Sequence, residues 1–98
     1  MLSIIKNAIE GRRILEIYYP PGRRLVEPHT LGYGADGSLL LRAFQNEGAS
    51  ASGEHVNWKL FRVDRARELE PSGNLFFGPR PGYRKGDSAM KGGIIVEM

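Results

Sequence analysis

The sequence predicts a mainly β fold, a small barrel of about five strands behind one N-terminal α-helix. Apolar residues recur with helical spacing only at the start of the chain, and the pattern changes near residue 12 to the two-residue alternation of strands. Helical spacing does not return over any long stretch after that point. Glycine, proline and aspartate interrupt the alternating part at short intervals, which favours several short strands.

The helix is expected at the very start of the chain. Leu2, Ile5 and Ile9 lie three and four residues apart and form one apolar stripe. Ser3 is expected to cap the start of the helix and Gly11 its end, because these residue types satisfy the free backbone groups found there.

Five strands are expected to follow the helix. The first ends at Pro20-Pro21-Gly22, and the hairpin between the second and third contains Asp36-Gly37, a strong turn signal. Residues 46–57 are small or polar with little to bury, so they are expected to form a mobile loop. The strands are expected at residues 14–19, 25–33, 38–44, 58–63 and 67–70.

Proline and glycine recur from Pro71 onward and predict an extended tail, with one further strand near residues 94–97. The expected organisation is a barrel domain, residues 1–71, and a C-terminal tail, residues 72–98, packed on the barrel or on a neighbouring subunit. Small open barrels leave a strand edge unpaired, so self-association as a homodimer is also expected.

Composition narrows the classes of function. Fourteen Lys and Arg residues against eleven Asp and Glu give a net charge of +3, and because there is no long basic run, an anion site has to be built from separated arginines.

The absence of cysteine excludes disulfides, thiolate-bound metals and thiol catalysis, and it suits a reducing cytoplasm. The longest apolar runs span three residues, so we expect a soluble cytoplasmic protein without a membrane span.

The glycines of residues 32–37 match the dinucleotide-binding pattern G-x-G-x-x-G. That site needs a crossover helix after its third glycine, and residues 38–42 are too short a segment to form one before the Gly/Ser-containing loop. A plain hairpin is therefore the preferred interpretation.

Catalysis would have to use His29 or His55 with Ser50 or Ser52. No nucleophile-elbow motif surrounds either serine, and no carboxylate is marked to orient a histidine. Two histidines without a spaced third ligand make a poor metal site. We therefore expect no enzyme, no metal and no cofactor, and we interpret His55 as a solvated loop residue.

Residues 59–67 carry four cations and one anion around a strand end. One interpretation is a solvated strand edge in which Asp64 pairs with one arginine. The other is a phosphate site, since the planar arginine fork suits phosphate and nearby aromatic rings suit a base. Trp58 and the Phe76-Phe77 pair are interpreted first as core or lid aromatics.

Four strand motifs follow the helix in a distinctive order. They are Leu15-x-Ile17-x-Tyr19, Arg24-x-Val26-x-Pro28-x-x-Leu31, Leu39-Leu40-Leu41-x-Ala43-Phe44 and Lys59-x-Phe61-Arg62-Val63-Asp64-Arg65. In this order they resemble the WYL domain, a bacterial family named for a Trp-Tyr-Leu run on its third strand, and the resemblance covers residues 2–70. Leu39-Leu40-Leu41 stands in place of the name-giving run.

The resemblance implies an Sm-like five-stranded barrel that binds a negatively charged ligand, either a nucleotide or single-stranded nucleic acid. The chain has no room for the winged-helix DNA-binding region that usually accompanies this domain, so it is expected to act with a separate DNA-binding or effector protein. The implied setting is transcriptional regulation or defence against foreign DNA. By position, the implied ligand-binding residues are Tyr19, His29, Lys59, Arg62 and Arg65, with Arg24 and Arg42 as neighbours of the site.

A second hypothesis is a structural or protein–protein interaction module that acts through its barrel edge and its tail. A ligand-binding module would be stabilised against heat by its ligand, because a ligand that binds only the native state shifts the folding equilibrium, whereas an interaction module would not respond to nucleotides. A hydrolase is the third and most distant hypothesis.

Overall fold

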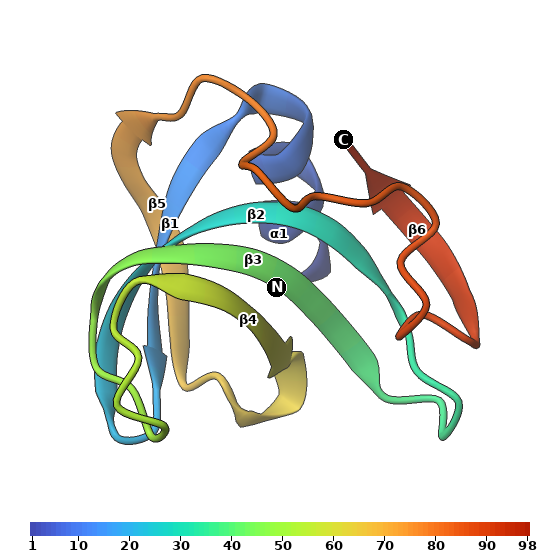
Figure 1. Cartoon of the computed structure of the whole chain (residues 1–98), viewed down its shortest axis with the longest axis horizontal. Helices are drawn as coiled ribbons and strands as arrows, with labels where there is room; N and C mark the ends of the chain where they lie inside the picture. The colour runs from blue at the N-terminus through green and yellow to red at the C-terminus, as the bar shows by residue number, and fades with distance from the viewer.

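One N-terminal helix and an open antiparallel sheet of six strands make up the computed structural model, which describes residues 1–98. The strand order is β4-β3-β2-β1-β5. The sixth strand, β6, stands outside this order and pairs with β2 (Figure 1). The prediction of a mainly β fold with one N-terminal helix is confirmed. The elements are α1 (Leu2–Gly11), β1 (Arg13–Tyr19), β2 (Gly22–Tyr33), β3 (Leu39–Gly48), β4 (Asn57–Arg62), the 3-10 turn η1 (Val63–Arg65), β5 (Glu68–Leu75) and β6 (Gly93–Glu97).

The core lies between α1 and one face of the sheet. Leu41 and Ala43 of β3 are buried and alternate with more exposed neighbours, as the two-residue period of a strand requires. Ile5 and Ile9 of the predicted stripe are buried in the same core, whereas Leu2 is 40% exposed. The buried apolar cluster consists of Ile5, Ala8, Ile9, Leu15, Ile17, Val26, Leu31, Leu41, Ala43, Phe61 and Val63.

The two ends of α1 differ from the prediction. Ser3 lies inside the first turn, because the N-cap position falls on Met1, and no side chain makes a capping bond there. At the other end Gly11 is the last helical residue, and Arg12 takes the left-handed conformation with φ 54° and ψ 48°. The chain leaves the helical conformation at Arg12 because β1 begins at the next residue.

β2 is the central strand of the sheet. One of its edges pairs with β3, and the other edge is shared: β1 lies beside residues 22–26 and β6 beside residues 30–33. The strand predicted near residues 94–97 is therefore present, and it extends the sheet of its own chain. β4 and β5 form the two ends of the sheet and are connected through η1.

Two strands extend further than their sequence patterns predict. β5 continues through Pro71 to Leu75, because β5 has only β1 as a neighbour and an edge strand tolerates the missing N–H group of proline. β3 continues to Gly48, whose φ is 115°, and a Cβ atom there would lie 2.4 Å from the carbonyl oxygen of Arg23. Only glycine permits this close approach to β2, and the connecting loop is shortened to residues 49–56.

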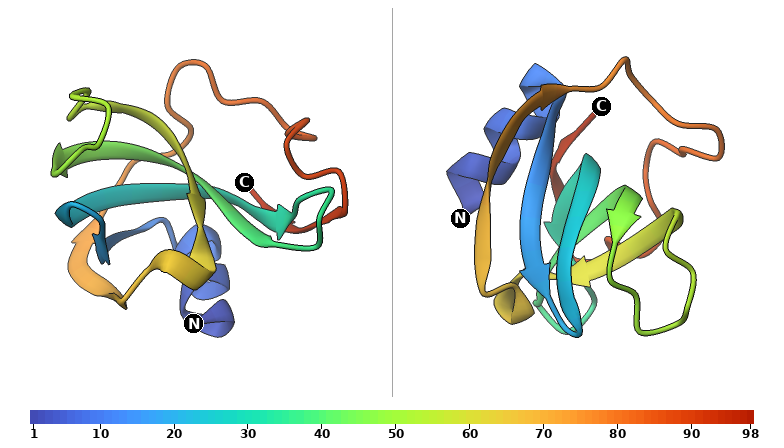
Figure 2. Two further views of the ribbon diagram at one scale, coloured as in Figure 1. Left: turned by 90° about the horizontal axis from the view of Figure 1, so that it is seen from below. Right: turned by 90° about the vertical axis from the view of Figure 1, so that its left-hand side faces the viewer.

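Residues 76–92, which we call the covering segment, cross the face of β2 and β3 that lies opposite α1 (Figure 2). Two ion pairs attach the covering segment to the sheet, one between Arg80 and Glu27 of β2 and the other between Asp87 and Arg42 of β3. The sheet therefore has one face covered by the helix and one face covered by an irregular segment.

The aromatic pair at the start of the covering segment is divided between the interior and the solvent. Phe76 is buried beside His29, with ring centroids 5.5 Å apart, whereas Phe77 is fully exposed. The interpretation of both rings as core or lid residues is therefore correct for Phe76 only. The structure contains no helix with the length and apolar character that a membrane crossing requires.

Candidate functional site

Arg24 and Arg65 lie beside Tyr19 on the helix-facing side of the sheet, and Lys59 of β4 lies on the same side. We call Tyr19, Arg24, Lys59 and Arg65 the basic cluster. Strand alternation places two of the cations there: Arg24 stands two residues before the core residue Val26, and Lys59 two before Phe61. The cluster therefore lies at the border of the apolar core, on the same face of the sheet as Val26 and Phe61.

Arg24 is the most buried cation of the molecule, with 4% of its surface exposed. Its Nε donates to the Tyr19 carbonyl oxygen at 3.2 Å, its Nη1 to Gln45 Oε1 at 3.3 Å, and its Nη2 to the Pro20 carbonyl oxygen. All three acceptors are neutral, and no carboxylate lies within ion-pair distance. Burial lowers the pKa of the Arg24 guanidinium, since the charged form loses its hydration.

The Tyr19 ring lies close to two guanidinium groups. The central carbon of Arg24 is 5.2 Å from the ring centroid and that of Arg65 is 5.6 Å from it, distances at which the ring attracts a cation. The ring also packs edge-on against Phe61 with centroids 4.9 Å apart, and its hydroxyl accepts the backbone N–H of Arg62 at 3.3 Å. Tyr19 is therefore fixed in place, and the exposed Arg65 forms the outer rim of the cluster.

Lys59 is half-buried beneath the loop of residues 49–56. Its ammonium group donates to Ser50 Oγ at 3.0 Å and to Ser52 Oγ at 3.2 Å, so its contacts are also neutral. Gln45 holds the same loop, since its amide group donates to the carbonyl oxygens of Ala49 and His55 at 2.8 and 3.1 Å. One glutamine therefore connects Arg24 to the loop that covers Lys59.

Gln45 was not predicted as part of the site. It is fully buried and continues the inward-facing alternation of Leu41 and Ala43. A polar side chain at a position where the strand pattern demands an apolar one is the signal that would have identified it.

Arg62 points away from the basic cluster, although its backbone bonds Tyr19. Its guanidinium pairs with Asp64 at 3.3 Å and approaches Asp36 at 3.7 Å. The prediction that Asp64 pairs with one arginine of this segment is confirmed. Because Lys59 and Arg62 are three residues apart on β4, they lie on opposite faces of the strand.

His29 and Arg42 lie beneath the covering segment on the other face of the sheet. His29 is fully buried, its Nδ1 is 2.7 Å from the carbonyl oxygen of Glu27, and its Nε2 accepts the backbone N–H of Arg80 at 3.1 Å. The resemblance implies that His29 and Tyr19 both bind the ligand, but His29 is buried beneath Arg80 and does not share a surface site with Tyr19. His29 shares the outer face with Glu27, and residues far along the chain cover that face.

The remaining histidine, His55, is exposed in the loop, and its Nδ1 lies 2.8 Å from the Gly48 carbonyl oxygen. No group of three or more His, Cys, Asp or Glu side chains converges to hold a metal ion. Chemically, the basic cluster offers positive charge, hydrogen-bond donors and an aromatic ring. Comparisons with protein-family models, with curated proteins and with solved structures found no match to this chain.

Proposed function

We propose that this protein is a non-enzymatic binding module for a phosphate-bearing ligand, a nucleotide or a single strand of nucleic acid, and that the basic cluster is its site. The observation that carries the proposal is the charge imbalance of the cluster. Arg24 is buried and Lys59 half-buried, and neither has a carboxylate within ion-pair distance. Buried cations without an anionic partner are costly, and an anion bound from outside would compensate them.

The exposed rim of the cluster supports a ligand with both phosphate and ring character. Arg65 presents its planar fork beside the Tyr19 ring, a combination that suits phosphate and a stacked base. The serine hydroxyls that accept from Lys59 belong to the loop, so a phosphate could replace them at the ammonium group if the loop moved.

The resemblance to the WYL domain supports the same class of ligand. Under that resemblance residues 2–70 correspond to an Sm-like barrel with its N-terminal helix, and residues 72–98 to its tail. The setting would be regulation or defence against foreign DNA, together with a separate DNA-binding or effector protein.

Fluorescence anisotropy with a labelled single-stranded oligonucleotide, titrated at several salt concentrations, tests this proposal. Arg65→Gln and Lys59→Gln should each weaken binding and make the salt dependence shallower by roughly 0.7 in log–log slope for each phosphate that the variant no longer neutralises. Arg62→Gln is the matched control, because Asp64 and Asp36 already compensate its charge. Equal effects of all three variants, or no binding by the parent chain, would contradict the basic cluster as the site.

A protein–protein interaction module remains the second candidate, and two exposed apolar side chains favour it. Phe77 is fully exposed and Leu75 is 63% exposed, close together in sequence at the end of β5. The end strands β4 and β5 each have one neighbour in the sheet, so each leaves one edge open for pairing, including pairing in a homodimer. Light scattering of the parent chain and of Phe77→Ser measures this: a mass that falls to the monomer value in the variant supports self-association through this end.

A further inference from the structure

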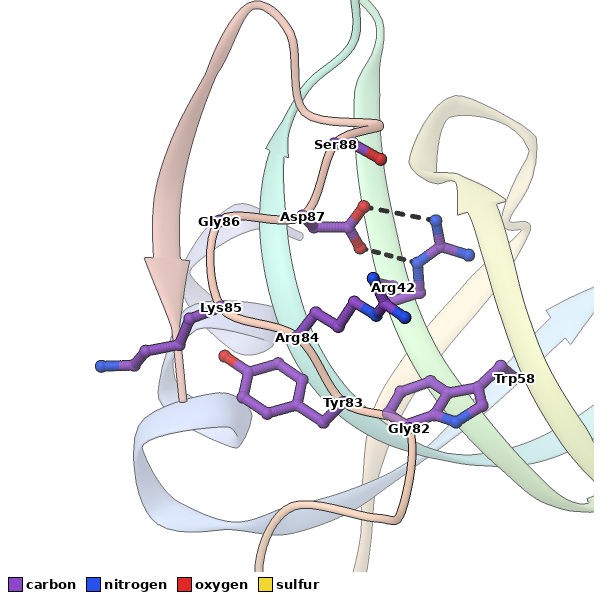
Figure 3. A pocket seen from close by; sticks show the side chains of 9 residues that line it. All are labelled: Arg42, Trp58, Gly82, Tyr83, Arg84, Lys85, Gly86, Asp87 and Ser88. Carbon is purple, nitrogen blue, oxygen red and sulfur yellow. Dashed lines mark hydrogen bonds and ion pairs between the residues drawn. The ribbon is translucent and has the colours of Figure 1, made fainter.

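A second cleft, which we call the outer cleft, lies on the face of the sheet opposite the basic cluster. It is enclosed between Trp58 of β4, Arg42 of β3 and residues 82–88 of the covering segment (Figure 3). Its volume is about 490 Å³. Pockets for small ligands typically measure roughly 300–1,000 Å³, so the outer cleft is large enough for a compact organic molecule.

Two aromatic side chains of the outer cleft are fixed by their own polar atoms. Trp58 Nε1 donates to the Pro81 carbonyl oxygen at 2.9 Å, and the Tyr83 hydroxyl donates to the Met98 carbonyl oxygen at 2.9 Å. Both rings also pack against the buried His29, with centroids 4.7 and 5.3 Å from it. Their rings are therefore held in position without needing a ligand to satisfy their hydrogen bonds.

The charges of the outer cleft are arranged to accept an anion. Arg42 pairs with Asp87 through Nε at 2.7 Å and Nη2 at 3.3 Å, which leaves its Nη1 without a protein acceptor. Arg84 has no carboxylate within ion-pair distance, and Figure 3 shows its side chain running toward Arg42 while Lys85 points away. The cleft is therefore bordered by two guanidinium groups and by only one carboxylate, that of Asp87.

We propose that the outer cleft binds a nucleoside monophosphate, with its base against Trp58 and its phosphate between Arg84 and Arg42. The aromatic ring supplies the stacking surface for the base, and the two guanidinium groups supply planar donors for phosphate oxygens. This site is separate from the basic cluster, since the two lie on opposite faces of the sheet.

Trp58 is the single tryptophan of the chain and lines this cleft, so its fluorescence reports on ligand binding there. The experiment titrates the parent chain with AMP and GMP and follows tryptophan emission, corrected for nucleotide absorption with free tryptophan. We expect saturable quenching by both nucleotides. Adenosine, which lacks the phosphate, should bind roughly tenfold more weakly, and ribose 5-phosphate, which lacks the base, should produce no quenching.

Three variants place the binding site. Arg84→Gln should weaken AMP binding roughly tenfold, because it removes one charged donor to the phosphate. Lys91→Gln is the matched control, since Lys91 is not among the residues that line the cleft, and it should leave the affinity unchanged. Arg65→Gln alters the basic cluster and should also leave the quenching unchanged, so failure of that cluster as a ligand site does not affect this result.

Two outcomes would overturn the proposal. One is the absence of saturable quenching by AMP and GMP up to roughly millimolar concentration. The other is quenching that weakens in Arg65→Gln and persists in Arg84→Gln, which would assign the nucleotide to the basic cluster. The emission spectrum of each variant, recorded before nucleotide is added, verifies that Trp58 keeps its packed environment.

Discussion

The Arg80 guanidinium donates two hydrogen bonds to the Glu27 carboxylate, from Nε to Oε1 and from Nη2 to Oε2, each 2.8 Å long. The Glu27 side chain is 3% exposed, whereas that of Arg80 is 43% exposed. The backbone N–H of Arg80 also donates to His29 Nε2. One residue of the covering segment therefore satisfies two buried groups of β2.

Arg80→Met should destabilise the protein by about 3 kcal/mol, because it leaves the buried carboxylate of Glu27 without its cationic partner. The free energy of unfolding in urea measures the loss. Arg84→Met, a neighbouring change at an arginine without an ion pair, should cost far less. Similar losses for the two variants would show that the Glu27–Arg80 pair does not anchor the covering segment.

Stability should fall as the pH drops below about 6.5, the ordinary pKa of histidine. Burial lowers the pKa of His29, so the native state keeps it neutral while the unfolded state takes up a proton. The unfolded state then binds more protons, and the free energy of unfolding decreases with decreasing pH. Protonation at Nε2 would also remove the acceptor of the Arg80 N–H.

Urea denaturation between about pH 8 and pH 5 measures this dependence. His29→Gln should flatten it, and His55→Gln, a change at the exposed histidine, should leave it in place. Burial raises the pKa of Glu27, but hydrogen bonds from Arg80 and Asn46 outweigh burial and hold it below 4.5, so Glu27 titrates outside this range. A slope that persists in His29→Gln would contradict the assignment.

Arg24→Met should separate binding from stability. The substitution should weaken oligonucleotide binding about tenfold, while the free energy of unfolding changes by no more than about 1 kcal/mol, since removing an uncompensated buried charge offsets the missing hydrogen bonds. Arg24→Lys keeps the charge and should restore part of the affinity. A large loss of stability in Arg24→Met with unchanged binding would show that Arg24 is a structural residue only.

Gly82→Ala should destabilise the protein more than Gly86→Ala. Both glycines have positive φ, 93° and 69°, so alanine is strained at either position by about 1 kcal/mol. A Cβ at Gly82 would also lie 2.9 Å from Trp58 Nε1, whereas nothing lies within 4 Å of a Cβ at Gly86. Gly82→Ala should therefore shift the tryptophan emission as well. Equal stabilities and identical spectra would contradict a rigid Trp58 contact.

The strand pattern could be predicted because it is local. The two-residue alternation around Leu15 and Leu41 reports which face of a strand meets the core, and Asp36-Gly37 marks a hairpin without reference to the rest of the chain. The extension of β5 through Pro71 could not be predicted in this way, because only the sheet order shows that β5 is an end strand.

The site was harder to predict for a similar reason. Residue type and motif order gave seven candidates. Arg24 and Arg65 do lie beside Tyr19, and Lys59 lies on the same side of the sheet. The side chains of His29, Arg42 and Arg62 lie elsewhere. The covering segment has no hydrophobic period, so nothing in its Gly/Pro-rich sequence indicates that it buries His29. A residue's exposure depends on segments that are distant in sequence, which a comparison of motifs does not include.

The shared edge of β2 has a consequence for the newly made chain. Ribosomes release β2 and β3 well before residues 76–97, so for an interval half of one β2 edge and the aromatic outer face are open to other chains. At a synthesis rate of roughly 5–20 residues per second, this interval lasts a few seconds. The covering segment and β6 thus end a period of exposure that begins at synthesis.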